Sequence, residues 1–335
     1  MFRAGPRNLI TDVAGLTVGN AADPVLKSGV TVVMCDEPAV AGVQILGGAP
    51  GTRETDLLDP HNSVERINAV ALSGGSAFGL DAASGVQAAL REMGIGFDVR
   101  GLRIPIVPAA ILFDLHNGGD KNWRRYPPYR ELGYEAALAV ASDFKLGTEG
   151  AGTGALSANL KGGLGSASTV LENGINVGAL AAANPTGTVT IGTTRHFWAA
   201  PFEIGDEFGG LGLPSPWPAD AQNLSIKFRK AARAGANTTI AVIATDAVLT
   251  KPEAKRLAIA AHDGFTRAIW PAHTPVDGDL VFGLATGRSG IAPSPDAAID
   301  LYAAAGATMA RAIALAIHAA TPAEGDLMPV WSTME

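Results

Sequence analysis

The chain has 335 residues, 47% of them hydrophobic and 17% charged, with 41 glycines and a formal net charge of -7. This composition excludes a disordered or fibrous protein and indicates closely packed layers of small side chains. The acidic balance argues against a nucleic-acid partner. No run approaches the roughly 18 apolar residues of a membrane span, so we expect no membrane association. A single cysteine, Cys35, excludes an internal disulfide and fits a buried thiol in a cytoplasmic protein.

The first third of the chain predicts a sheet followed by a helix. Apolar runs at 29–34, 43–46 and 67–72 are typical of strands with buried faces. A glycine-rich turn at 74–79 leads into residues 79–93, where apolar side chains recur at helical spacing. Gly94 is placed to end that helix.

The rest of the chain continues the alternation. We expect helices at 132–144, 251–270 and 297–319, and extended segments at 161–170, 188–191, 238–245 and 280–285. Between them, 194–234 loses periodicity and ends in a basic cluster at 227–233, which is typical of a long loop or linker. No fixed-period repeat interrupts the pattern, so we expect a single layered α/β domain over 1–335.

Several familiar kinds of site do not fit this sequence. Gly150, Gly152 and Gly154 lack the spacing and strand-turn-helix order of a nucleotide loop. The six histidines are scattered without zinc-ligand spacing, and Phe78 stands where a nucleophile elbow after Ser76 needs glycine. We therefore expect no metal and no cofactor.

The bond between Asn237 and Thr238 is the most informative local feature. It joins the irregular segment to a β-branched run, which by itself is a weak signal because threonine commonly begins strands. Chemically, the Thr238 hydroxyl can attack the preceding carbonyl, form an ester and leave a free amine after hydrolysis. An α-amino group has a pKa near 7.7 to 8.0, so it can then take the proton of its own hydroxyl near neutral pH.

A set of motifs in the same order carries a wider resemblance. They are segment 10–19, the turn Gly74-Gly75-Ser76-Ala77-Phe78-Gly79-Leu80, segments 104–114 and 150–168, Asn184-Pro185, Asn237-Thr238 and Asp277-Gly278-Asp279. With these residues the chain resembles the self-processing L-aminopeptidase/D-esterase family, which includes beta-aminopeptidases and aminohexanoate-oligomer hydrolases. The resemblance implies a four-layer α/β/β/α sandwich like that of N-terminal-nucleophile hydrolases. It also implies cleavage into 1–237 and 238–335 and a homo-oligomer of cleaved protomers.

The resemblance extends to individual polar residues. It implies that Asn184 donates its amide to a developing oxyanion and that Lys161 stabilises this charge or orients the nucleophile's hydroxyl. Asp277 and Asp279 match the carboxylates that orient the new ammonium group in aminohexanoate-oligomer hydrolases. From local sequence alone, the same residues read as a turn asparagine, a solvated lysine and an acidic turn.

The expected activity is hydrolysis of small linear amides by Thr238. Aminoacyl amides, short peptides and aminohexanoate oligomers are the substrate classes that the resemblance implies. At Phe113, a substrate-binding position, several relatives have a tyrosine, so their phenolic hydroxyl is absent here. Two alternatives stay open: an uncleaved metabolite-binding protein of the same fold, and an acyltransferase related to ornithine acetyltransferase.

Overall fold

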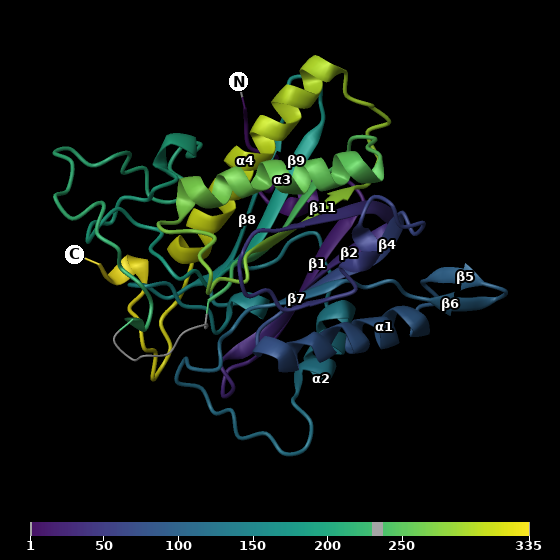
Figure 1. Cartoon of the computed structure of the whole chain (residues 1–335), viewed down its shortest axis with the longest axis horizontal. Coiled ribbons are helices and arrows are strands. Elements are labelled where there is room, and N and C mark those ends of the chain that lie inside the picture. Colours follow the sequence, from purple (N-terminus) through teal and green to yellow (C-terminus); the bar gives the residue numbers. More distant parts are fainter. Residues whose placement is uncertain (1, 230–236, 335) are drawn as a thin grey trace.

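The computed structural model describes residues 2–229 and 237–334, which form a mixed sheet covered by helices (Figure 1). The helices are α1 (Ala82–Glu92), α2 (Tyr129–Leu138), α3 (Lys251–Ala268) and α4 (Pro295–His318). The strands are β1 (Leu16–Asp23), β2 (Ser28–Ile45), β3 (Thr52–Arg53), β4 (Arg66–Ser73), β5 (Phe97–Val99), β6 (Leu102–Ile104), β7 (Ala109–Ile111), β8 (Gly163–Val170), β9 (Asn176–Ala183), β10 (Ile240–Thr245) and β11 (Leu280–Ala285). Within the described residues, nine strands form one sheet in the order β3-β7-β4-β2-β11-β10-β9-β8, with β1 beside β2.

The sheet folds over itself along its longest strand. The first half of β2 pairs with β1 and β4, its second half pairs with β11, and its register with β4 shifts between Met34 and Ala39. As a result, Leu72 of β4 and Leu180 of β9, which lie far apart in the strand order, share one buried cluster. The two halves of the sheet face each other across this cluster, which also contains Cys35.

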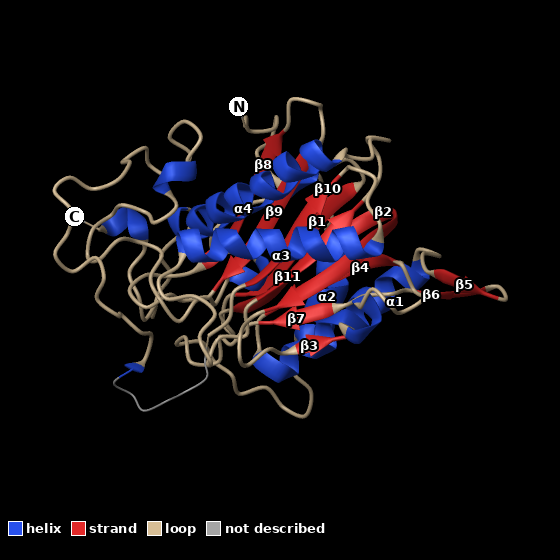
Figure 2. Ribbon diagram, turned by 45° about the horizontal axis from the view of Figure 1, so that its top comes forward, coloured by secondary structure: helices blue, strands red, loops and turns tan. Residues whose placement is uncertain are grey.

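Two further apolar clusters attach the helices. One lies between α3, α4 and the half of the sheet that contains β8 to β11, and the other lies between α1, α2 and the half that contains β1 and β4. Figures 1 and 2 show these two helix pairs on opposite sides of the strands. The order of layers is therefore helices, sheet, sheet, helices, and the expected α/β/β/α fold is confirmed.

Strand β10 occupies the middle of one sheet layer. It pairs antiparallel with β9 and parallel with β11. Ile240 and Val242 point into the cluster between the sheet halves, while Ala241 and Ile243 pack beneath α3 and α4. A strand buried on both faces carries apolar residues at successive positions, which explains the β-branched run in the sequence. The residues that begin β10 are therefore fixed by β9 on one side and by β11 on the other.

Helix α4 has the length and apolar character of a membrane span, with a mean hydropathy of 1.3 over its most apolar stretch. In the structure, 83% of that stretch is buried, against α3, β8 and β9. Its N-terminus is capped by the Ser294 side chain, which accepts from the Ala297 N–H at 3.3 Å. We therefore assign α4 as a core helix.

The structure corrects four of the expected elements. The runs at 29–34 and 43–46 belong to one long strand, β2, instead of two. The helix expected at 132–144 is α2, which begins at Tyr129 and ends at Leu138, after which Ala141 bridges to Val18. The run at 188–191 forms isolated bridges and no strand, since Thr188 pairs only with Trp270 and Thr190 only with Phe197.

Candidate active site

Thr238 lies just before β10, buried with 3% of its surface exposed. Its main-chain N–H donates to the carbonyl of Asn184 at 3.0 Å. Its hydroxyl donates to the carbonyl oxygen of Asn237, the residue before it. The same carbonyl oxygen accepts the N–H of Gly278 at 3.1 Å. The nucleophile expected from the sequence therefore lies against the bond expected to break, and a main-chain donor polarises that bond. Gly235 and Ala236, which precede Asn237 in the sequence, lie outside the described residues.

Asn184 follows β9 directly and is buried with a fixed amide orientation. Its Oδ1 accepts from the N–H of Leu156 at 2.9 Å, and its Nδ2 donates to the carbonyl of Phe113 at 3.0 Å. Because a main-chain N–H can only donate and a carbonyl can only accept, these two contacts fix which end of the amide is oxygen. The structure thus brings Asn184 to Thr238 and places the main chain of Phe113 against the Asn184 side chain. The Phe113 ring packs against His116 with the ring centroids 5.4 Å apart.

Asp277 ties together the loops on either side of the site. One carboxylate oxygen accepts from the N–H and hydroxyl of Thr186, at 3.1 and 2.6 Å. The other accepts from the N–H and hydroxyl of Thr274, at 2.9 and 2.6 Å. Asn237 and Asp277 also form a parallel bridge. Asp277 therefore positions the backbone beside the Asn237 carbonyl.

Asp279 begins a chain of polar side chains that leads away from the nucleophile. Its Oδ1 accepts the N–H of Thr239 at 2.8 Å, and its Oδ2 lies 3.0 Å from Nδ1 of His273. His273 Nε2 lies 3.3 Å from Nδ1 of His262, whose Nε2 lies 3.0 Å from the Gln44 carbonyl. The main-chain carbonyl of Gln44 only accepts, so neutral His262 donates to it from Nε2. Nδ1 of His262 is then an acceptor, and Nε2 of His273 donates to it. Asp279 and His273 therefore share one proton at their contact. Burial raises the pKa of Asp279, and the hydrogen bond from His273 opposes that rise.

Lys161 is hydrogen-bonded to the C-terminal segment. Its ammonium group donates to Asp326 at 2.6 Å and to the carbonyl of Thr321 at 3.0 Å. Asp326 also pairs with Lys27 at 2.9 Å. Within the described residues, the hydrogen bonds of Lys161 connect it to the C-terminal segment and not to Thr238.

A second lysine, which the sequence did not single out, contacts Asn184. Lys227 is 3% exposed, and its Nζ donates to the side-chain oxygen of Asn184 at 2.8 Å. Burial lowers its pKa to about 7, although the charges of Asp277, Asp114 and Asp279 act in the opposite direction. It belongs to the aperiodic segment, where sequence alone offers no signal that distinguishes a buried lysine from a solvated one.

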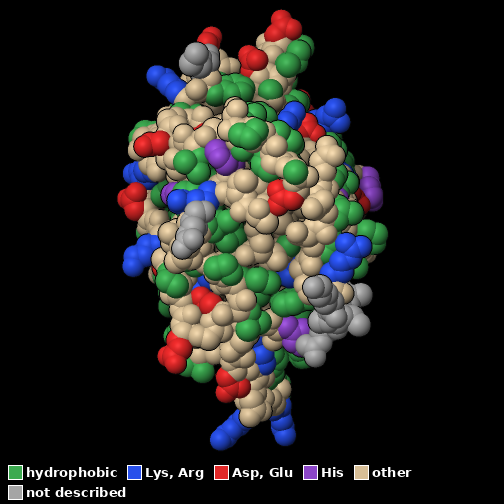
Figure 3. Space-filling view, turned by 90° about the vertical axis from the view of Figure 1, so that its left-hand side faces the viewer, with side chains coloured by type: hydrophobic (Ala, Val, Ile, Leu, Met, Phe, Trp, Pro, Cys, Tyr) green, Lys and Arg blue, Asp and Glu red, His purple; other side chains and the backbone are tan. Residues whose placement is uncertain are grey.

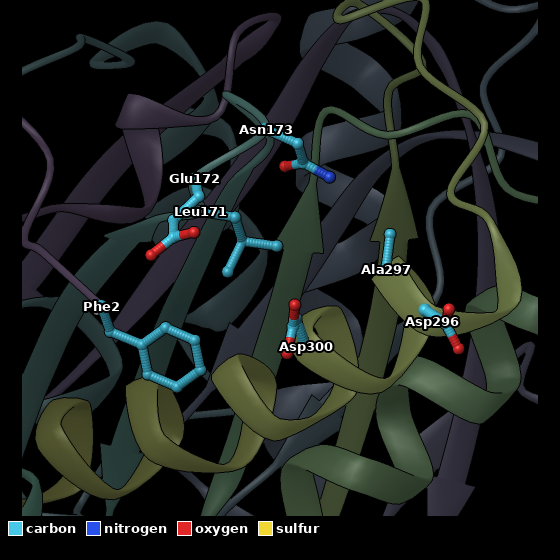
Figure 4. A pocket seen from close by; sticks show the side chains of 7 residues that line it. All are labelled: Phe2, Leu171, Glu172, Asn173, Asp296, Ala297 and Asp300. Carbon is cyan, nitrogen blue, oxygen red and sulfur yellow. The ribbon is translucent and has the colours of Figure 1, made fainter.

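Two open cavities of the described residues lie away from Thr238. One of about 630 Å³ is lined by Phe2, Leu171 and Asp300, among others, beside the start of α4 (Figure 4). Another of about 650 Å³ lies between α3 and α4, next to Phe202 and Tyr302. Neither is lined by Thr238, which is enclosed in the intact chain.

The chain is similar in sequence to two groups of hydrolases. The chain is 42% identical over 341 residues to an uncharacterised aminopeptidase of Mycobacterium tuberculosis (strain ATCC 25618 / H37Rv), covering 95% of this chain and 96% of the relative. It is 26% identical over 307 residues to a 6-aminohexanoate-oligomer endohydrolase of Kocuria sp. (strain KY2), covering 87% of this chain and 78% of the relative.

Solved structures show the same fold at low sequence identity. A beta-aminopeptidase of Burkholderia sp. superposes with a TM-score of 0.69 at 21% identity, over 100% of this chain and 94% of that one. The L-aminopeptidase D-Ala-esterase/amidase of Ochrobactrum anthropi, a variant of the Ntn hydrolase fold, gives 0.67 at 23% identity, over 98% and 92%. The profile of peptidase family S58 matches residues 8–328. The chain therefore belongs to peptidase family S58 and is an amide hydrolase.

Proposed function

We propose that the chain is a precursor that cleaves itself between Asn237 and Thr238 and then uses Thr238 as an N-terminal nucleophile. The observation that carries this proposal is the contact between the Thr238 hydroxyl and the Asn237 carbonyl, whose oxygen also accepts from Gly278. Attack of Oγ1 on the carbonyl carbon breaks the C–N bond as the nitrogen takes a proton, which leaves an ester. Water then hydrolyses the ester to give the Asn237 carboxylate, the Thr238 hydroxyl and a free amine.

In the cleaved enzyme, one residue supplies both nucleophile and base. The amine of Thr238 accepts the hydroxyl proton as the oxygen attacks a substrate amide, and water later releases the acyl group. We assign Asn184 to the oxyanion and Asp277 and Asp279 to the orientation of the new amine, through the backbone that they hold. A direct role for Lys161 requires its ion pair with Asp326 to open first.

The substrates that we propose are small linear amides. Aminopeptidase and 6-aminohexanoate-oligomer endohydrolase are the activities named for the two relatives. The burial of Thr238 between packed layers supports small substrates over folded proteins. We further propose that the protein is a cytoplasmic, single-domain homo-oligomer of cleaved protomers.

The test is the intact mass of the purified chain and of two matched variants. We expect wild type to separate into 1–237 and 238–335, while Thr238→Ala stays whole and does not turn over any amide. Thr239→Val is the control, because the Thr239 hydroxyl is buried without a hydrogen-bond partner among the described residues, and we expect it to cleave normally. A wild-type chain that remains whole would favour an uncleaved binding protein. Products that form only with an amine acceptor would favour an acyltransferase.

A further inference from the structure

Lys227 is anchored at both its main chain and its side chain. Nζ donates to the Leu156 carbonyl at 2.7 Å, to Asn184 Oδ1 at 2.8 Å and to the Asn184 carbonyl at 3.1 Å. An ammonium group has three N–H donors, so these three oxygens use all of them. Its main-chain N–H donates to the Thr186 carbonyl at 2.9 Å. All these partners precede the bond between 237 and 238, so cleavage of that bond leaves Lys227 and its partners in the same polypeptide.

The Asn184 carbonyl connects Lys227 to Thr238. The Thr238 N–H donates to this oxygen at 3.0 Å and Lys227 Nζ donates to it at 3.1 Å, so the two nitrogens are at most about 6 Å apart. In the intact chain the Thr238 nitrogen is an amide, which takes no proton near neutral pH. Cleavage turns it into an amine, and a protonated amine would then stand beside a second positive charge.

We propose that Lys227 is a positioning residue of the active site: its ammonium group holds Asn184 in place and disfavours a second positive charge on the amine of cleaved Thr238. The inference rests on the self-cleavage proposed above. It gives the aperiodic segment before the cleavage site a defined part in the chemistry.

The charges around the two nitrogens oppose each other. Asp277, Asp279 and Asp114 face Lys227 and favour the protonated form of any nearby amine. His273 offsets part of the Asp279 charge through the proton that they share. The amine of Thr238 must be unprotonated to accept the hydroxyl proton, so a neighbouring cation helps to keep it a base at neutral pH.

The test is the pH dependence of Thr238 amine reactivity in three variants of the full chain. Each cleaved protein is treated with acetic anhydride across a pH series, and acetylation of Thr238 is followed by peptide mapping. We expect Lys227→Met to raise the pH midpoint of Thr238 acetylation by about one unit or more. Loss of the neighbouring positive charge favours the protonated amine, and two unit charges this close interact strongly even at an effective dielectric constant of about 20. Lys227→Arg is charged at every pH of the series, whereas burial lowers the pKa of Lys227 to about 7, so the midpoint of the arginine variant should equal that of wild type or lie below it.

The matched control is Lys251→Met. Lys251 is also buried and donates to two carbonyls, those of Leu57 at 2.9 Å and Asn62 at 2.8 Å, at the start of α3. We expect its midpoint to equal that of wild type.

Each outcome decides the inference. A cleaved Lys227→Met protein with the wild-type midpoint overturns it, as does a folded Lys227→Arg protein with a raised midpoint. If Lys227→Met folds but stays uncut, cleavage of Lys227→Arg supports the role of the charge. If both variants fold and neither is cleaved, the inference is overturned. A wild-type chain that stays uncut instead removes the proposed function on which the inference rests.

Discussion

Gly278 lies between the two acidic residues of the site and next to the bond between Asn237 and Thr238. Its N–H donates to the Asn237 carbonyl at 3.1 Å. A Cβ at this position would stand 2.7 Å from Thr238 Oγ1 and 2.7 Å from the carbonyl oxygen of Ala49. During attack by Thr238, negative charge develops on the Asn237 oxygen, and a donor already in place stabilises it. Glycine thus provides both the donor and the room that the hydroxyl needs.

We therefore expect Gly278→Ala to slow self-cleavage by at least about 10-fold, because the added methyl displaces either the hydroxyl or the donor. A time course on denaturing gels after rapid purification measures the rate. Gly306→Ala is the control: Gly306 lies in α4, and the nearest atom to its added Cβ is a flexible Arg267 nitrogen at 3.2 Å. Cleavage of folded Gly278→Ala at the wild-type rate would show that this contact is unnecessary.

The sequence could point to some residues of the site and not to others. Thr238, Asn184 and the two aspartates belong to short motifs. In the structure these four residues lie around the main-chain carbonyls of Asn184 and Asn237. Their catalytic roles stay predictions. Lys227 could not be found, because its burial depends on contacts with Leu156 and Asn184, which are distant in the chain and leave no local pattern.

At the scale of elements, a buried histidine of helix α3 makes a hydrogen bond to strand β2. His262 of α3 lies with Nε2 3.0 Å from the Gln44 carbonyl. Burial lowers its pKa from 6.5 to about 4, and the neighbouring His273 contributes in the same direction. Between these two pH values the unfolded chain binds a proton at this position and the folded chain does not. The free energy of unfolding therefore falls as the pH drops from about 6.5 to about 4.

We expect this histidine to account for a loss of up to about 3 kcal/mol over that range, and His262→Gln to remove most of it, since glutamine can donate to the same carbonyl without titrating. Urea unfolding of the uncleaved Thr238→Ala chain at several pH values measures the effect. His61→Gln, at an exposed histidine, should leave the pH dependence unchanged. An equal loss with and without His262 would assign the acid sensitivity to other groups.

The spacing of apolar residues predicted several of the elements. Helix α4 is largely apolar and strand β4 contains the apolar run 69–72, and both elements were expected from the sequence. Strand β9 was missed because its glycine and alanine residues carry no β-branched signal, although they pack closely between β8 and β10. The end of α2 was misplaced because Ala141 leaves the helix to bridge Val18, a contact that no local pattern encodes.

At the scale of the whole molecule, the hairpin of β5 and β6 extends away from the body of the protein (Figure 1). Its exposed side chains include Phe97, Val99, Leu102 and Ile104. An isolated two-stranded hairpin is marginally stable in water, and an apolar one gains from being covered. On the opposite face of the molecule, hydrophobic side chains are spread among scattered acidic and basic ones (Figure 3). The hairpin is therefore the surface where we look for the proposed assembly of protomers.

We expect Leu102→Glu to weaken that assembly, because it places a charge where an apolar contact would form. Light scattering coupled to size-exclusion chromatography gives the mass of each species. Ile299→Glu is a matched control, since Leu102 and Ile299 are each 68% exposed and Ile299 lies on α4. If both variants keep the wild-type mass, the hairpin is not the contact between protomers.

The central place of β10 has a consequence for the lifetime of the enzyme. If the chain is cut before Thr238, β10 and β11 belong to one polypeptide, while β9 and β2, which flank them, belong to the other. Folding of the precursor is unimolecular, because the backbone holds both parts at a high effective concentration. After the cut, the same sheet can be rebuilt only by a second-order encounter of two fragments. The mature enzyme would then stay active for as long as it does not unfold, so a slow unfolding rate would set its lifetime. After denaturation, the yield of refolded enzyme would fall on dilution.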